Sequence, residues 1–237
     1  MPEYSSTCLD AMRAVSTATL TTQLFKRGLR NTFCQGIRPL GRYEKNLVGP
    51  AFTLRNIPAR EDLDVLENFS NPKHPQRYAI EATPAGHVLV IDCRGDARAA
   101  SGGDILMTRL MVRGVAGVVS DGGVRDSLPI AALPMPVYCA GPSAPLNLVV
   151  HHATETQVPI GCGGVAVFPG DLIVADADGV VVVPAHLAEE VARDAAEQER
   201  MEAWIVERIR GGAKLPGTYP PDAATRAAYE AWRAAQG

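Results

Sequence analysis

The sequence predicts an α/β fold, and two observations carry that prediction. An apolar run of strand type over 87–92 is followed by a helical pattern over 104–113 and a second apolar run over 115–120. Strand, helix and strand in such close succession favour a parallel crossover unit. With 237 residues, of which 46% are hydrophobic, the chain can bury one substantial core. We therefore expect one domain with an appendage.

The part of the chain before this unit predicts two helices and a strand. Residues 7–28 have a helical pattern with a break near Ser16 and Thr17, because a hydroxyl can cap a new helix. A strand that includes a proline follows over 48–54, and a short helix is expected over 60–67. The polar stretch 71–76 fits either a mobile insertion or a lid, and the residues alone do not choose between the two.

The part after the crossover unit predicts short strands and then long helices. The expected elements are a proline-edged strand over 132–139, two short strands within 158–178, a buried strand over 180–184, a long helix over 189–210 and a last helix over 222–234. We divide the chain into a domain over 1–210 and a C-terminal extension over 211–237. The extension has little core of its own, so we expect it to pack on the body or on a neighbouring subunit.

Composition argues against several classes of partner. The net charge is −3, whereas a sequence-independent grip on nucleic acid needs a basic face. The basic cluster 26–30 fits the solvated end of a helix, where cations are favoured. No apolar run approaches the roughly 20 residues of a membrane span, and the first residues do not resemble a signal peptide. Five scattered cysteines without a C-x-x-C pair indicate reduced thiols. We expect a cytoplasmic protein that binds neither nucleic acid nor membrane.

A glycine pair with an acid opens the helical pattern of the crossover unit. The exposed amides that follow Gly102 and Gly103, together with the helix dipole, can bind a carboxylate or a phosphate. The same residues also fit a tight turn in which Asp104 caps the helix. The glycine pair alone leaves these two interpretations equally supported.

Charged residues follow the second strand of the unit, after Asp121-Gly-Gly-Val. They lie at the carboxyl end of the predicted strand, at the edge of the sheet where ligands bind in open α/β folds. Arg125 offers a planar fork for a carboxylate, and Asp126 can hold a hydrated divalent cation. An ion pair at a turn is the simpler alternative. Taken with the glycine pair, the arrangement favours a site for a small anionic substrate and a metal ion.

Other catalytic constellations are missing from the sequence. The string 161–166 matches G-x-G-x-x-A, but strand and turn residues follow it where a dinucleotide site needs a helix. There is no G-x-S-x-G elbow and no P-loop. His151 and His152 are adjacent, so on a strand they point to opposite faces and cannot share one zinc ion. The lysines lie in polar or loop contexts, which weakens a Schiff-base aldolase.

The stretches 103–106 and 113–126 strongly resemble the RraA-like family. That family includes 4-hydroxy-4-methyl-2-oxoglutarate aldolases with oxaloacetate decarboxylase activity, and proteins named as regulators of ribonuclease activity. Residues 16–19, 36–40, 167–172 and 176–184 agree with the family as well, so the resemblance covers about 15–210. It implies a swivelling β/β/α domain with a helical C-terminal extension. It also implies a homotrimer or homohexamer with active sites at subunit interfaces.

The resemblance also implies roles for the matching residues. Arg125 would contact the pyruvyl keto oxygen and the enolate. Asp104 would position a metal-bound water, and Asp126 would ligate Mg²⁺ or Mn²⁺ directly. The amides expected to bind the pyruvyl carboxylate are those of Gly103, Asp104, Ile105 and Leu106.

Two parts of the chain depart from the family pattern. Many relatives carry an acid where this chain has Thr21-Thr22-Gln23, and the tail from 211 is longer than in compact members. The family also uses a glutamate from a neighbouring subunit, which Glu199 or Glu202 could match. These parts shape the outer half of the pocket, so they leave the physiological substrate open.

The resulting hypothesis is a divalent-metal-dependent pyruvate aldolase. It would cleave a 4-hydroxy-2-oxo acid to pyruvate and a carbonyl product, and would decarboxylate oxaloacetate through the same enolate. One alternative is a hydrolase of a 2,4-diketo acid at the same metal site. The other is a non-catalytic binding protein that resembles the ribonuclease regulators. The sequence does not separate aldol cleavage from hydrolysis.

Overall fold

The computed structural model describes residues 3–236 and has an α/β fold built on one eight-stranded sheet. The strand order is β1-β6-β4-β3-β2-β11-β12, and β8 pairs with the far half of β2. The strands of this sheet are β1 (Arg38–Pro39), β2 (Leu47–Pro58), β3 (Val88–Asp92), β4 (Gly117–Ser120), β6 (Val137–Cys139), β8 (His151–Thr156), β11 (Leu172–Ala175) and β12 (Val180–Val183). Two small sheets join β9 (Ile160–Cys162) to β10 (Val165–Val167) and β5 (Gly123–Val124) to β7 (Gly141–Pro142).

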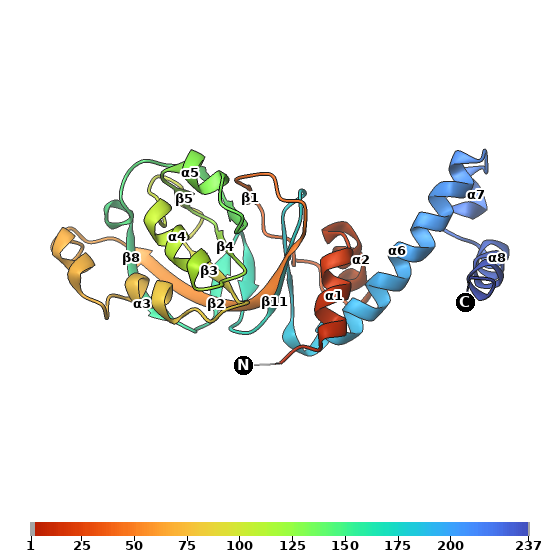
Figure 1. The fold of residues 1–237 in the computed structure, drawn as a ribbon, viewed down its shortest axis with the longest axis horizontal. Coiled ribbons are helices and arrows are strands. Elements are labelled where there is room, and N and C mark those ends of the chain that lie inside the picture. The colour runs from red at the N-terminus through yellow and green to blue at the C-terminus, as the bar shows by residue number, and fades with distance from the viewer. Residues whose placement is uncertain (1–2, 237) are drawn as a thin grey trace.

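The helices cover the sheet and extend beyond it (Figure 1). The α-helices are α1 (Ser6–Ala14), α2 (Thr17–Lys26), α3 (Pro75–Ala82), α4 (Asp104–Val112), α5 (Ser127–Ala131), α6 (Ala188–Arg210), α7 (Leu215–Thr218) and α8 (Ala223–Ala234). Three 3-10 turns are η1 (Leu66–Ser70), η2 (Asn147–Val149) and η3 (Ala185–Leu187).

The expected crossover unit forms the centre of the sheet. Strand β3 pairs in parallel with β2 on one side and with β4 on the other, and α4 connects β3 to β4. Side chains alternate across the strand, so Leu89 and Ile91 enter the core beneath the helices. Val88 and Val90 enter a second core on the opposite face. Residues 88–91 of the strand are all apolar because both of its faces are buried.

A third core joins the sheet to the helices α1, α2 and α6. The predicted break between the first two helices is confirmed, since Ser16 caps α2 by accepting a hydrogen bond from the Thr19 amide at 3.1 Å. On β11 and β12, Leu172 and Val181 face these helices. Figure 1 shows α1 and α2 side by side with α6 at the edge of the body.

Two expectations about the stretch 60–82 were wrong. The short helix expected over 60–67 is a set of turns followed by η1. The Asp64 carboxylate explains this, because it accepts a hydrogen bond from the Arg60 amide at 2.8 Å and contacts the His152 ring at 2.8 Å. The polar loop expected over 71–76 ends in α3, whose first residue is Pro75, a position that suits proline.

The C-terminal extension forms an arm at the end of α6 (Figure 1). Helix α8 packs back on α6, where the Trp204 and Tyr229 rings lie 5.6 Å apart. The Tyr229 hydroxyl donates to Glu197 at 2.9 Å. The division of the chain at residue 210 stays a prediction. Within residues 3–236, no helix combines the length and the apolar character that a bilayer span needs.

Candidate functional site

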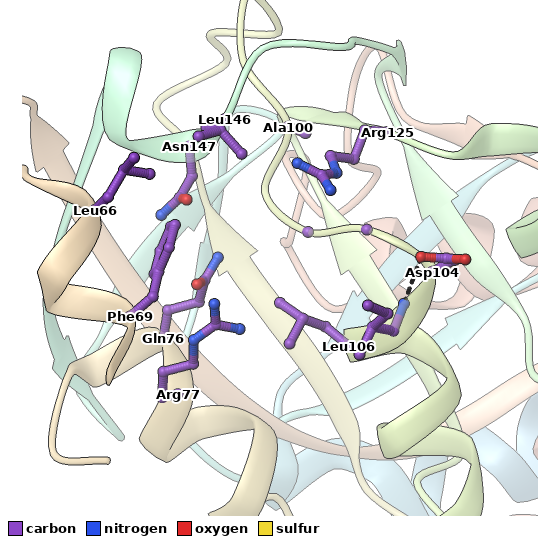
Figure 2. A pocket seen from close by; sticks show the side chains of 13 residues that line it. Leu66, Phe69, Gln76, Arg77, Ala100, Asp104, Leu106, Arg125, Leu146 and Asn147 are labelled. Atoms are coloured by element: carbon purple, nitrogen blue, oxygen red, sulfur yellow. Dashed lines mark hydrogen bonds between the residues drawn. The ribbon is translucent and has the colours of Figure 1, made fainter. Parts of the chain in front are cut away.

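A cavity of about 290 Å³ lies where the glycine pair and the Arg125 loop meet. Helix α4 and the Arg125 loop form one wall, and η1, α3 and the start of η2 form the other (Figure 2). The volume suits a small molecule. The lining residues are Leu66, Phe69, Gln76, Arg77, Ala100, Gly102, Gly103, Asp104, Ile105, Leu106, Arg125, Leu146 and Asn147.

The first amides of α4 are bound to carboxylates of the chain itself. The Asp104 amide donates to Asp126 Oδ2 at 3.3 Å, and the Ile105 amide donates to the Asp104 carboxylate at 2.7 Å. The Leu106 amide donates to the Gly103 carbonyl at 3.1 Å. The free N–H groups of a helix start attract anions. The expectation that Asp104 caps the helix is wrong, because the N-cap residue is Gly103 and Asp104 is the first residue of α4. The amides at this helix start do contact carboxylates, as the anion-site interpretation requires.

Gly103 is required by the close approach of the Arg125 loop. A Cβ at this position would lie 2.6 Å from Asp126 Oδ2 and 3.0 Å from Arg125 Nε. The backbone of Gly103 is extended, so its conformation alone does not require glycine. The Arg125 amide donates to the Gly102 carbonyl at 3.1 Å, which joins the two motifs.

Arg125, which lines the cavity, forms an exposed ion pair with Asp126, which does not line it. Arg125 Nε donates to Asp126 Oδ2 at 3.2 Å, and the two side chains are 41% and 37% exposed. Asp126 has a left-handed backbone, with φ of 55°, and is the N-cap residue that precedes α5. Strained backbone of this kind is common at functional sites. Figure 2 shows the Arg125 guanidinium directed toward the opposite wall, where Asn147 lies.

Asp121 braces the loop that carries this pair. Its carboxylate is buried and accepts hydrogen bonds from the amides of Cys93, Gly95 and Gly163, at 2.6, 2.9 and 3.3 Å. Burial raises the pKa of Asp121, although the three amides act to lower it. This first acid of the motif is therefore a structural residue.

The wall opposite Arg125 comes from residues to which the sequence had assigned no role. Gln76 and Arg77 lie in the first turn of α3, Phe69 lies in η1 and Asn147 begins η2. The pair His74-Pro75 could have indicated that a helix begins there, since proline is favoured at the first position of a helix. The stretch 71–76, which the sequence left open between a mobile insertion and a lid, contributes Gln76 to this wall.

The glutamates considered for an intersubunit role lie elsewhere in the chain. The Glu199 carboxylate accepts hydrogen bonds from the Ser16 amide and hydroxyl, at 2.9 and 2.7 Å. Burial acts to raise the pKa of Glu199, but these hydrogen bonds hold it below its usual value. Glu202 accepts a hydrogen bond from Gln198 at 2.9 Å. Neither residue lines the cavity of its own chain.

The protein groups at the cavity fit a hydrated cation better than a closed metal cage. Across residues 3–236, no three His, Cys, Asp or Glu side chains gather into a metal-binding group. Mg²⁺ is commonly held by one or two carboxylates and keeps several waters. Asp126 offers one exposed carboxylate of this kind. All five cysteines are buried and free of disulfide bonds.

Comparison with curated proteins identifies relatives over most of the chain. A protein of Halalkalibacterium halodurans, provisionally named 4-hydroxy-4-methyl-2-oxoglutarate aldolase, is 37% identical over 163 residues, which cover 69% of this chain and 71% of the relative. A shorter match of 38% identity over 111 residues is to a protein of Aromatoleum aromaticum with the same provisional name, and covers 47% of this chain and 69% of that one.

Solved structures share the fold. An uncharacterised protein from Pseudomonas syringae pv. tomato matches 92% of this chain and 99% of its own, with 27% identity and a TM-score of 0.77. Streptomyces coelicolor RraAS2, described as an unusual member of the RNase ES inhibitor RraA family, matches 86% of this chain and 98% of its own, with 31% identity and a TM-score of 0.75. The family model described as RraA-like, Aldolase/RraA, matches residues 12–182. The chain therefore belongs to the RraA-like family and has the fold of its solved members.

Proposed function

We propose that this protein is a divalent-metal-dependent carbon–carbon lyase. It cleaves a 4-hydroxy-2-oxo acid to pyruvate and a carbonyl compound, and it decarboxylates oxaloacetate. The observation that carries the proposal is that Arg125 and the α4 amides line one cavity. Asp126 lies outside that lining but accepts hydrogen bonds from both the Asp104 amide and Arg125 Nε. The provisional aldolase names of two relatives support the same reaction class.

The start of α4 is the proposed site for the carboxylate of the 2-oxo acid. Its Asp104 and Ile105 amides already donate to carboxylate oxygens of the protein, so a substrate carboxylate would make the same bonds in their place. The partial positive charge of the helix start favours this exchange. Gly103 keeps the approach open, because any larger residue would fill it with a Cβ.

Arg125 is the proposed donor to the keto oxygen. When the C3–C4 bond breaks, negative charge moves onto that oxygen, and a guanidinium placed beside it stabilises the charge. Removing one such donor costs about 10²- to 10³-fold in rate in other enzymes. The guanidinium reaches into the cavity (Figure 2).

Asp126 is the proposed direct ligand for Mg²⁺ or Mn²⁺. A divalent ion there would supply Lewis-acid polarisation of the keto group. Asp104 is proposed to hold a water beside the substrate, which requires its carboxylate to leave the Ile105 amide. A proton from the 4-hydroxyl would pass to that water as the C3–C4 bond breaks, and the return of a proton to C3 of the enolate would give pyruvate.

The test is a coupled pyruvate-release assay on a panel of 4-hydroxy-2-oxo acids and oxaloacetate, with Mg²⁺, with Mn²⁺ and with chelator. We expect Arg125→Ala and Asp126→Ala to lower kcat/KM by at least about 10²-fold while circular dichroism stays unchanged. Arg109→Ala is the matched control, since Arg109 lies on the same helix α4 but pairs with Glu81 at 2.8 Å and does not line the cavity.

Turnover like that of the wild type in either site variant would show that the site is wrongly assigned. No turnover on any substrate, with or without metal, would favour a binding protein. The homotrimer or homohexamer implied by the family resemblance stays a prediction, and light scattering of the purified protein measures it.

A further inference from the structure

The cavity wall opposite Arg125 carries polar groups whose charge or hydrogen-bonding capacity is not fully satisfied by residues 3–236. Arg77 and Gln76 project from α3, and Asn147 projects from η2 (Figure 2). All three line the cavity. The roles proposed above for α4, Arg125 and Asp126 involve none of them.

Arg77 is a half-buried cation without a counter-ion. Its guanidinium carbon lies 4.4 Å from the centre of the Phe69 ring, and no carboxylate of residues 3–236 forms an ion pair with it. Burial lowers the pKa of Arg77, and no acid offsets that effect. Cations removed from water are normally paired, so the missing anion is the feature that needs an explanation.

Two buried amides beside Arg77 have hydrogen-bonding capacity left over. Asn147 is only 6% exposed, and its side chain makes no hydrogen bond to any described residue. Gln76 is 4% exposed and donates to the Ser101 carbonyl at 2.8 Å, but its Oε1 has no partner within the described chain. Most buried polar side chains are hydrogen-bonded, so these groups point to a ligand that supplies the missing bonds.

We propose that Arg77 and Asn147 form a second anion subsite, which binds a carboxylate at the end of the substrate remote from its 2-oxo acid group. This inference rests on the proposed function, because Arg125 and α4 would hold the 2-oxo acid end. The guanidinium fork matches a carboxylate, and the Asn147 amide adds a donor. The chain therefore selects dicarboxylic substrates over monocarboxylic ones of the same length.

The surroundings of the subsite hold the Arg77 guanidinium in place and partly exclude water from it. Leu66, Phe69 and Leu146 line the same wall, and the Phe69 face holds the guanidinium by a cation–π contact. The hydrogen bond from Gln76 to Ser101 ties the start of α3 to the loop before the glycine pair. A charge-assisted bond in such a place contributes about 10- to 100-fold in affinity.

The alternative is that Arg77 only packs against Phe69. A binding comparison distinguishes the two, using 2-oxoglutarate and 2-oxopentanoate, which have the same chain length but end in a carboxylate and in a methyl group. Titration calorimetry is run on the full chain with Mg²⁺ present. We expect the wild-type protein to bind 2-oxoglutarate about 10- to 100-fold more tightly, and Arg77→Met to reduce that ratio to about one. Arg77→Lys should give an intermediate ratio.

Arg109→Met is the matched control, because it also removes one arginine but from outside the cavity; it should keep the wild-type ratio. Thermal unfolding shows whether Arg77→Met is folded. Asn147→Leu, which keeps the side-chain size, is the second variant and should lower the ratio several-fold. An Arg77→Met or Asn147→Leu ratio equal to that of the wild type would overturn the proposal.

The outcomes also separate this subsite from the lyase proposal. Equal affinity of the wild-type protein for the two ligands would overturn the subsite and leave the pyruvate-releasing activity standing. Failure of the wild-type protein to bind either ligand would overturn both proposals. A preference for 2-oxoglutarate that depends on Arg77, found without any turnover in the pyruvate assay, would support the subsite and count against the lyase.

Discussion

Gly103→Ala is the sharpest test of how the two motifs cooperate. The added Cβ would lie 2.6 Å from Asp126 Oδ2, 3.0 Å from Arg125 Nε and 3.1 Å from Arg125 Cγ, whereas ordinary contacts begin at 3.4 Å. The carboxylate must therefore retreat by roughly 0.8 Å, and a shift of about 1 Å in a catalytic group can cost about 10²-fold in rate. We expect kcat/KM for pyruvate release to fall by about 10- to 100-fold.

The assay is the coupled measurement of pyruvate with Mg²⁺ varied, so that metal activation and turnover are obtained together. Both side chains end in exposed groups that can move, so unfolding free energy should fall by only about 1 kcal/mol, the low end for overpacking. Gly161→Ala is the control, since a Cβ there meets no atom within 4 Å. Wild-type kcat/KM and Mg²⁺ activation in Gly103→Ala would refute the reasoning.

Two further predictions concern stability. Asp121→Ala leaves the buried Cys93 amide and the part-buried amides of Gly95 and Gly163 without their acceptor. It should lower the unfolding free energy by about 2–4 kcal/mol, and a loss below about 1 kcal/mol in urea denaturation would contradict the bracing role. His151 is buried, and burial followed by the nearby Arg94 guanidinium lowers its pKa below 6.5. Its neutral form is therefore favoured in the fold, so its contribution to stability is complete above pH 6.5 and is lost as pH falls through the lower, folded-state pKa. The midpoint of urea unfolding should fall when the pH is lowered from about 7.5 to 5.5. This fall should be smaller in His151→Gln than in His186→Gln, the control at an exposed histidine. Equal falls in the two variants would contradict the role of His151.

The sequence was sufficient to predict the wall of the site that comes from the crossover unit. Strand β3, helix α4 and strand β4 are contiguous in the chain, and their apolar pattern and glycine stops are local features. Parallel pairing then carries the ends of β3 and β4 to one edge. This is why residues as far apart as Gly102 and Arg125 could be expected together, and a backbone hydrogen bond of 3.1 Å joins them.

The other wall could not be predicted from local pattern. Asn147 reaches the cavity through η2, just before β8 pairs with the far half of β2. Arg77 reaches the cavity because α3 begins at Pro75. The polar residues around Pro75 gave no apolar pattern from which this helix start could be predicted. The helix expected over 60–67 failed for a related reason, since the Asp64 carboxylate bonds His152, a residue 88 positions away. Long-range contacts of this kind override local propensity.

The carboxylates that occupy the start of α4 would connect the two binding equilibria proposed for this site, of a cation and of an anion. Asp126 Oδ2 accepts from both the Asp104 amide and Arg125 Nε, so a cation that takes this oxygen releases two donors for an incoming anion. Thermodynamic linkage makes the effect reciprocal: if the cation strengthens anion binding by some factor, the anion must strengthen cation binding by the same factor. The free protein would then hold either ligand weakly alone and both firmly together. If the proposed cation and anion bind here, their binding would be mutually strengthening without any movement of the fold.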